Sequence, residues 1–182
     1  KKQVMGKSLD SNLSENESKK KVDEVLKSMP ILSKCLEGSV KQDLRMKRGN
    51  IKEDNNLDKT EKKSNIVITD RNSQMYEKLL YSDPDGNYQV ILRGKVDGMN
   101  DEYVVETKNR TRRLFNKIPE YEKVQLNAYM FMTGKEKAIH IECYNDQQNQ
   151  TEYGFDKLFW ESCLDKVIEF TNNHIVCHLK DC

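Results

Sequence analysis

The stretch from Gly94 to Lys108, GKVDGMNDEYVVETK, constrains the fold of this chain more than any other. Residues 88–99 alternate apolar and polar side chains as a strand does, and residues 102–109 include strand-forming tyrosine and valine. Between them, Asn100 and Asp101 are residue types that tolerate the positive φ of a tight loop. The stretch predicts two antiparallel strands joined by a short turn.

Charged side chains converge on this hairpin. Because side chains alternate along a strand, Glu106 and Lys108 share a face, and the hairpin can bring Asp97 beside Glu106. Two adjacent carboxylates repel, and one takes up a proton unless a cation lies between them. Mg²⁺ typically binds through one or two carboxylates together with water and substrate phosphates. With a lysine beside the ion, the three residues suit metal-assisted phosphodiester hydrolysis.

The alternative is a surface salt-bridge cluster, which is common in a chain with 34% charged residues. The second strand, however, carries Val104 on the same face as Glu106, and Tyr103, Val105 and Thr107 on the other. An apolar residue beside Glu106 indicates a strand that is half-buried on both faces. Buried charges usually have a function, which favours the catalytic interpretation.

Asp97 followed by Glu106-Thr107-Lys108 resembles the D…ExK core of the PD-(D/E)XK nuclease superfamily. GKVDG at 94–98 and QLNAY at 125–129 resemble its RecB-like and lambda-exonuclease-like (YqaJ) branches, although Val96 stands where the superfamily name has proline. The resemblance covers roughly residues 48–170. It implies that Asp97 and Glu106 bind the metal, that the Thr107 carbonyl is a further ligand, and that Lys108 orients the attacking water.

Two further motifs carry the resemblance. Arg48 to Glu53 (RGNIKE) resembles the R-G-x-x-x-E motif of lambda-exonuclease-like enzymes, which implies a metal-site role for Glu53 and a phosphate contact for Arg48. A solvated helix face explains this segment equally well, with Glu37 as the other candidate carboxylate. Gln125 and Tyr129 lie four apart on a predicted helix. The resemblance places Gln125 beside the lysine or the substrate and Tyr129 near the nucleic acid, whereas a helix-edge glutamine and a core tyrosine are the alternative.

A basic segment follows the second strand. Residues 109–117 contain basic side chains and no acidic one, whereas the whole chain has a net charge of only +1. Positive charge is therefore concentrated in this segment. Its cations can bind phosphates without regard to base sequence; they are Arg110, Arg112, Arg113 and Lys117. Phe115 could stack on a base, but a place in the core beside Leu114 is the expectation for it.

The fold class predicted is α/β, with a central mixed β-sheet flanked by helices in the αβββαβ (restriction-endonuclease-like) core and an N-terminal helical extension. Residues 1–20 are expected to be a disordered or loosely attached lead-in, and residues 21–182 one nuclease domain, helical over 21–63 with the catalytic core over 64–182. The patterning predicts a helix over 20–36 interrupted at Pro30, strands over 65–69 and 75–81, a helix over 120–132 that begins at Pro119 and ends at Gly134, strands over 135–144 and 151–155, and a last helix capped by Asp156. The 135–144 strand should lie parallel to the Glu106 strand.

The cysteines indicate a reducing, intracellular compartment, because they are odd in number and form no CxxC pair; they are Cys35, Cys143, Cys163, Cys177 and Cys182. An iron–sulfur cluster on the cysteines, or zinc on His174, Cys177 and His178, lacks the required spacing. No stretch has the length and apolarity of a transmembrane segment, and the first residues lack an apolar signal core.

The function predicted is a Mg²⁺- or Mn²⁺-dependent DNA nuclease, an exonuclease that processes single-stranded or duplex DNA ends in recombination or repair. Two alternatives remain open: a non-catalytic nucleic-acid-binding module on the same fold, and a structure-specific endonuclease domain of a larger protein.

Overall fold

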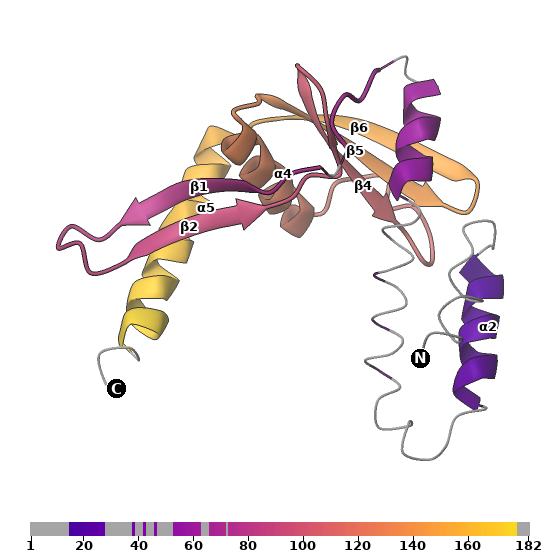
Figure 1. The fold of residues 1–182 in the computed structure, drawn as a ribbon, viewed down its shortest axis with the longest axis horizontal. Coiled ribbons are helices and arrows are strands. Elements are labelled where there is room, and N and C mark those ends of the chain that lie inside the picture. Colours follow the sequence, from indigo (N-terminus) through magenta and orange to yellow (C-terminus); the bar gives the residue numbers. More distant parts are fainter. Residues whose placement is uncertain are drawn as a thin grey trace. The chain divides into compact units, whose positions relative to one another are not determined.

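The computed structural model describes residues 15–27, 38, 42, 46, 53–62, 66–71 and 73–177. Its helices are α2 (Glu15–Lys27), a helix over 53–62, α4 (Glu120–Thr133) and α5 (Lys157–Phe170), which runs on into the π-helical turn η2 (Thr171–Val176) (Figure 1). Its strands are β1 (Tyr76–Ser82), β2 (Gln89–Gly94), β3 (Gly98–Met99), β4 (Tyr103–Asn109), β5 (Lys137–Tyr144) and β6 (Gln147–Gly154).

Four strands form a mixed sheet in the order β3-β4-β5-β6. β3 and β4 are antiparallel. β4 and β5 run parallel, because Glu102 just before β4 binds Lys137 at the start of β5 (2.7 Å), while the N–H of Arg110 just after β4 donates to the Cys143 carbonyl near the end of β5 (2.8 Å). A two-residue turn at 145–146 returns the chain antiparallel into β6. The mixed sheet confirms the predicted α/β class.

The helix α4 covers part of this sheet and also contacts β1, β2 and α5. It begins after Pro119 and ends at Gly134, whose φ of 72° is the left-handed conformation that favours glycine. Leu126 and Met130 on its buried face are fully inaccessible to water. They pack in the core with three buried residues of the sheet and its connections: Val96, Val104 and Ala138.

A polar network also joins elements of this region. Asn127 on α4 is fully buried. Its amide donates to the Tyr153 hydroxyl on β6 (3.1 Å), and its Oδ1 accepts from the N–H of Asp156 (2.9 Å). The Asp156 carboxylate in turn accepts from the N–H of Phe159 and caps α5, as predicted.

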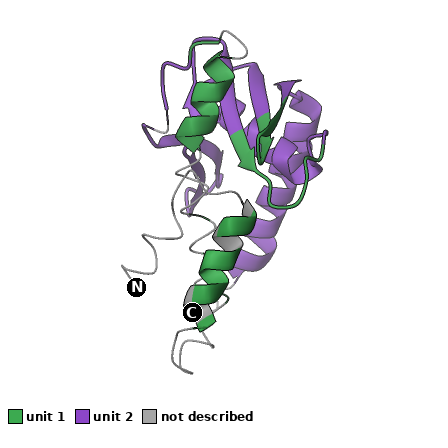
Figure 2. Cartoon of the chain, turned by 90° about the vertical axis from the view of Figure 1, so that its right-hand side faces the viewer, with its two compact units in different colours: residues 1–67, 107–115, 141–149 green, residues 68–106, 116–140, 150–182 purple. Residues whose placement is uncertain are grey.

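The chain divides into two compact units (Figure 2). One contains residues 1–67, 107–115 and 141–149, and the other contains residues 68–106, 116–140 and 150–182. The boundary cuts β4 between Glu106 and Thr107 and β5 between His140 and Ile141.

The expected single strand over 88–99 is wrong, because the chain forms two strands there. β2 pairs with β1 in a separate two-stranded sheet, whereas β3 pairs with β4. Gly94 ends β2 where α4 approaches closely: a Cβ at this position would lie 2.8 Å from Cε of Met132 and 3.1 Å from Cε1 of Tyr129. Over residues 66–69, the described part of the strand expected over 65–69, no strand forms, and the next residue, Asp70, makes an isolated bridge with Met99.

The hairpin loop also differs from the expectation. Neither Asn100 nor Asp101 has a positive φ. Instead, Oδ1 of Asn100 accepts hydrogen bonds from the N–H groups of Glu102 (2.9 Å) and Tyr103 (2.7 Å), which closes the turn through a side chain.

Three boundaries shift. β6 begins at residue 147, directly after the turn, and not at 151. Pro119 precedes α4 as its N-cap in an extended conformation (ψ 153°), and α4 begins at Glu120. Residues 15–20, expected to belong to a disordered or loosely attached lead-in, are helical and belong to α2. No helix in the described part of the chain is long and apolar enough to cross a membrane.

Candidate functional site

The register of the β3–β4 hairpin brings the chain toward the two predicted metal ligands. Gly98 pairs with Val105, and Met99 pairs with Val104. Asp97 lies at the bend just before β3, outside the paired residues. Continued by one residue, the same register would set Asp97 opposite Glu106, and residues opposite each other in antiparallel strands have Cβ atoms roughly 4.5–5.5 Å apart.

The burial of this pair is uneven. Val104 and Val105 are both fully buried, so β4 is covered on both faces, as the sequence predicted, and Glu106 is only 3% exposed. Its Oε2 atom is inaccessible to water. Asp97 is half-buried. A carboxylate held away from water beside a second carboxylate is costly in its charged form unless a positive charge offsets it.

The donor set fits a hard divalent cation. Carboxylate and carbonyl oxygens are the ligands that Mg²⁺ prefers, and the ion typically uses one or two carboxylates and completes its shell with water and phosphate. Across the described residues, no three His, Cys, Asp or Glu side chains form a group able to hold a metal. In the predicted site, Asp97 and Glu106 would supply carboxylate ligands.

The helix α4 covers the face of β4 that carries Glu106. Val104 packs in the core cluster with residues of α4, and Tyr129 packs against the same cluster. Glu106 lies two positions beyond Val104 and hence on the same face. Nε2 of Gln125 donates to the hydroxyl of Tyr129 (2.8 Å), so the predicted Q-x-x-x-Y pair is a hydrogen-bonded unit on the helix that covers this face.

Lys108 follows two positions after Glu106 in β4, so strand alternation places it on that face too. It is half-buried and engaged in interactions of its own. Thr107 between them points to the other face and is 5% exposed. Strand alternation thus keeps Glu106 and Lys108 on one face of β4, and the metal and catalytic roles of the D…ExK residues stay predictions.

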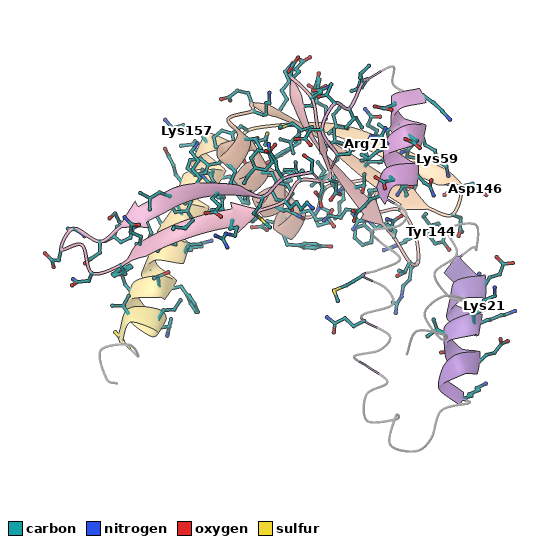
Figure 3. All side chains as sticks on the ribbon, viewed as in Figure 1. Lys21, Lys59, Arg71, Tyr144, Asp146 and Lys157 are labelled. Atoms are coloured by element: carbon teal, nitrogen blue, oxygen red, sulfur yellow. The ribbon has the colours of Figure 1, made fainter. Side chains whose placement is uncertain are left out.

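Glu53 lies in the helix over 53–62, which is joined by amide groups to Asn109 at the end of β4 and to Gln148 on β6. Nδ2 of Asn56 donates to Oδ1 of Asn109 (2.9 Å), and Nε2 of Gln148 donates to Oγ1 of Thr60 (2.7 Å). Asn56 and Thr60 are buried, whereas Lys59, labelled in Figure 3, is exposed. Asn109 lies on the face of β4 opposite Lys108.

Glu53 is half-buried and shares the buried face of its helix by its i, i+3 spacing to Asn56. Its role at the carboxylate pair stays a prediction. Arg48 and the alternative Glu37 lie outside the described residues.

The basic segment divides into one anchored arginine and three exposed cations. The Arg110 guanidinium binds Oε1 of Glu142 through Nε (2.7 Å) and Nη2 (2.6 Å), with side chains 9% and 1% exposed. Arg110 therefore anchors this segment to β5, a different role from the phosphate contact expected of it. Arg112, Arg113 and Lys117 are exposed and keep the expected role as a prediction.

One buried polar pair was not found from the sequence. Nε2 of His140 on β5 lies 2.7 Å from Oε2 of Glu122 on α4, and both residues are almost completely buried. His140 was expected to be structural, and its contact across the helix–sheet interface agrees with that role. The sequence feature that could have predicted the burial of Glu122 is its i, i+4 spacing to Leu126, which places it on the apolar face of the helix.

The described cysteines Cys143, Cys163 and Cys177 are free thiols, and burial raises the pKa of the Cys163 thiol. Sγ of Cys177 donates to the carbonyl of Asn172. Cys35, His178 and Cys182 lie outside the described residues, so the zinc and iron–sulfur alternatives gain no support from these contacts.

Comparison with models of known protein families gives no match, and comparison with curated proteins gives none either. Among solved structures, the chain is similar to the crystal structure of SSO0001, with a TM-score of 0.53 and 17% sequence identity. The similarity covers 84% of this chain and 81% of that one. At this level of identity, the two proteins share the α/β fold.

Proposed function

We propose that this chain is a Mg²⁺- or Mn²⁺-dependent deoxyribonuclease that processes DNA ends. The observation that carries the proposal is the register of β3 on β4, which, continued by one residue, would set Asp97 opposite the buried Glu106. Lys108 follows on the same face. The resemblance of these residues to the D…ExK core of PD-(D/E)XK nucleases supports the same reaction.

The residues have separate tasks in this proposal. Asp97 and Glu106 would hold the ion through carboxylate oxygens, with the Thr107 carbonyl as a further ligand. The ion, when bound, supplies a Lewis acid that activates water and neutralises phosphate charge. Lys108 orients the attacking water and stabilises the negative charge that develops on the phosphate. Gln125, held by Tyr129, contacts the lysine or the substrate.

The first experiment tests metal dependence. Cleavage of linear DNA should require Mg²⁺ or Mn²⁺, stop in EDTA and fail with Ca²⁺. Asp97→Asn and Glu106→Gln should each lower the rate by at least about a hundredfold, because each removes a ligand of the ion. Asp101→Asn is the matched control, since Asp101 is exposed in the same hairpin loop. Full activity in EDTA contradicts the proposal.

The second experiment separates chemistry from binding. Lys108→Ala should lose cleavage while it binds DNA within a few-fold of wild type in Ca²⁺. Lys157, exposed at the start of α5 (Figure 3), supplies the control Lys157→Ala, which should cleave normally. Equal loss of binding and cleavage in Lys108→Ala would make Lys108 a phosphate anchor only.

The third experiment tests the need for a DNA end. Covalently closed and linearised forms of one plasmid are incubated with protein and Mg²⁺, beside the Asp97→Asn variant. We expect degradation of the linear form and little attack on the circle. Discrete fragments from the circle would indicate an endonuclease and leave the metal site standing. Binding without cleavage of any form would favour a non-catalytic module.

A further inference from the structure

Phe115 lies at the surface in the middle of the basic segment. The ring was expected to enter the core, but the residue is 40% exposed, while its neighbour Leu114 is half-buried. Exposed large aromatic residues next to cations are a feature of surfaces that bind single-stranded nucleic acid, where successive bases stack on aromatic rings.

The ring is held in a fixed place by buried groups. The guanidinium carbon of Arg110 lies 4.0 Å from the centroid of the Phe115 ring and covers one face of it. That guanidinium is itself bound to the buried Glu142, whose Oε1 also accepts from the N–H of Phe115 (3.3 Å). The Arg110 backbone is tied to β5 through the carbonyl of Cys143. A ring placed in this way loses little conformational freedom when a ligand stacks on it.

The charge around the ring indicates the chemistry of that ligand. Arg112 and Arg113 precede it, Lys117 follows it, and all three are exposed. The segment 109–117 has no acidic side chain. A flat apolar surface flanked by cations complements a base flanked by phosphates, and a base can reach the ring only where it is unpaired.

We propose that Phe115 is a stacking platform for an unpaired base of single-stranded DNA, with Arg112 and Arg113 on the neighbouring phosphates. The proposal deepens the proposed function, since it names a single-stranded segment at a DNA end as the substrate of the same protein. Arg110 and Glu142 position the ring and touch no DNA.

The test compares four forms of the full chain by fluorescence anisotropy in EDTA, with a labelled single-stranded oligothymidine and a blunt hairpin duplex as probes. Phe115→Ala should weaken single-strand binding roughly 5- to 150-fold, the range for loss of one base–aromatic stack. Duplex binding should change by less than about threefold, because the cations remain. Phe115→Trp should bind like wild type. Phe115→Leu keeps apolar volume without a flat ring and should behave like Phe115→Ala.

A salt titration distinguishes stacking from charge. Phe115→Ala should keep the slope of log K against log salt, whereas the Arg112→Ala, Arg113→Ala double variant should lower it by up to about 1.4, at roughly 0.7 per phosphate contact on a single strand. Thermal unfolding checks that each variant is folded. If Phe115→Ala unfolds, the Leu and Trp variants decide, because both fill the site and only one is flat.

Three outcomes overturn the proposal: no single-strand binding by wild type, normal binding by Phe115→Leu, or equal weakening of both probes. These outcomes are independent of the proposed nuclease activity. A wild-type protein that needs Phe115 to bind single strands and cleaves nothing keeps the platform and loses the nuclease. A protein that cleaves with metal and binds equally without the ring keeps the nuclease and loses the platform.

Discussion

The buried ion pair between Arg110 and Glu142 gives the sharpest test of what holds the basic segment in place. Glu142 is 1% exposed, and its Oε1 accepts from two nitrogens of the guanidinium at 2.7 and 2.6 Å. Glu142→Gln keeps the shape and one acceptor but removes the charge. The guanidinium then remains buried without a compensating anion, so the folded state should lose stability.

The magnitude follows from the loss of the buried anion. Removing one partner of a buried ion pair costs about 3–5 kcal/mol, because it leaves a buried charge uncompensated. The glutamine carbonyl still accepts a hydrogen bond from the charged guanidinium, so the loss in the free energy of unfolding should lie near or below the lower end of that range, at about 2–3 kcal/mol. This loss is a substantial part of a total stability of about 5–15 kcal/mol.

Urea denaturation followed by far-UV circular dichroism measures the loss from the shift in midpoint at constant slope. Glu102→Gln is the matched control, because Glu102 binds Lys137 at 2.7 Å on the exposed surface, where such pairs contribute little. Arg110→Met combined with Glu142→Met should recover most of the stability, since an apolar pair of similar volume removes both charges together.

Two results would refute this reasoning. If Glu142→Gln changed stability no more than Glu102→Gln, the pair would be solvated rather than buried. If the double methionine variant were less stable than Glu142→Gln, the charges would contribute a net stabilisation that their desolvation does not cancel.

Three further predictions follow from contacts within the fold. Gly94→Ala should destabilise by about 1 kcal/mol in urea denaturation, the low end of the overpacking range, because its Cβ would lie 2.8 Å from the flexible end of Met132 and 3.1 Å from the Tyr129 ring. Gly154→Ala, with nothing within 4 Å, should be neutral, and equal effects would contradict the close approach. Asn56→Ala should lose about 0.5–1.5 kcal/mol by removing the hydrogen bond from its buried amide to the half-buried Asn109, and no loss would contradict a structural role for that bond. The hydrogen bond from Lys137 holds the pKa of Glu102 below its ordinary 4.5, so the stability that the Glu102 carboxylate contributes is complete above that pH and is lost as the pH falls through the lower folded pKa. Wild type and Glu102→Gln should therefore converge in stability in acid, and a difference that stays constant with pH would contradict this prediction.

Local signals in the sequence determined much of the fold. Gly134 ends α4 in a left-handed conformation and Asp156 caps α5, as predicted, because both depend on a few consecutive residues. The apolar pattern of the strand–helix–strand segment predicted the parallel pairing of β4 and β5, since a crossover of that length returns with one handedness. The α/β class followed from the same order of elements.

The core of the candidate site was also present in the sequence. Strand alternation sets Glu106 and Lys108 on one face. A short antiparallel hairpin allows few registers, so the sequence could predict that Asp97 and Glu106 lie near each other. The apolar residues around Glu106 already indicated burial on both faces of β4, which the fully inaccessible Val104 and Val105 confirm.

Only the tertiary structure decided the features that depend on distant partners. The 88–99 segment reads as one strand, but β2 and β3 pair with different neighbours, and no local pattern encodes that choice. Arg110 reads as one of several surface cations until Glu142, 32 positions away, takes it into a buried pair. The same pair leaves Phe115 at the surface, where its sequence neighbours suggested a core residue. Alternation and capping act over a few residues, whereas the burial of a charge depends on which strand packs beside it.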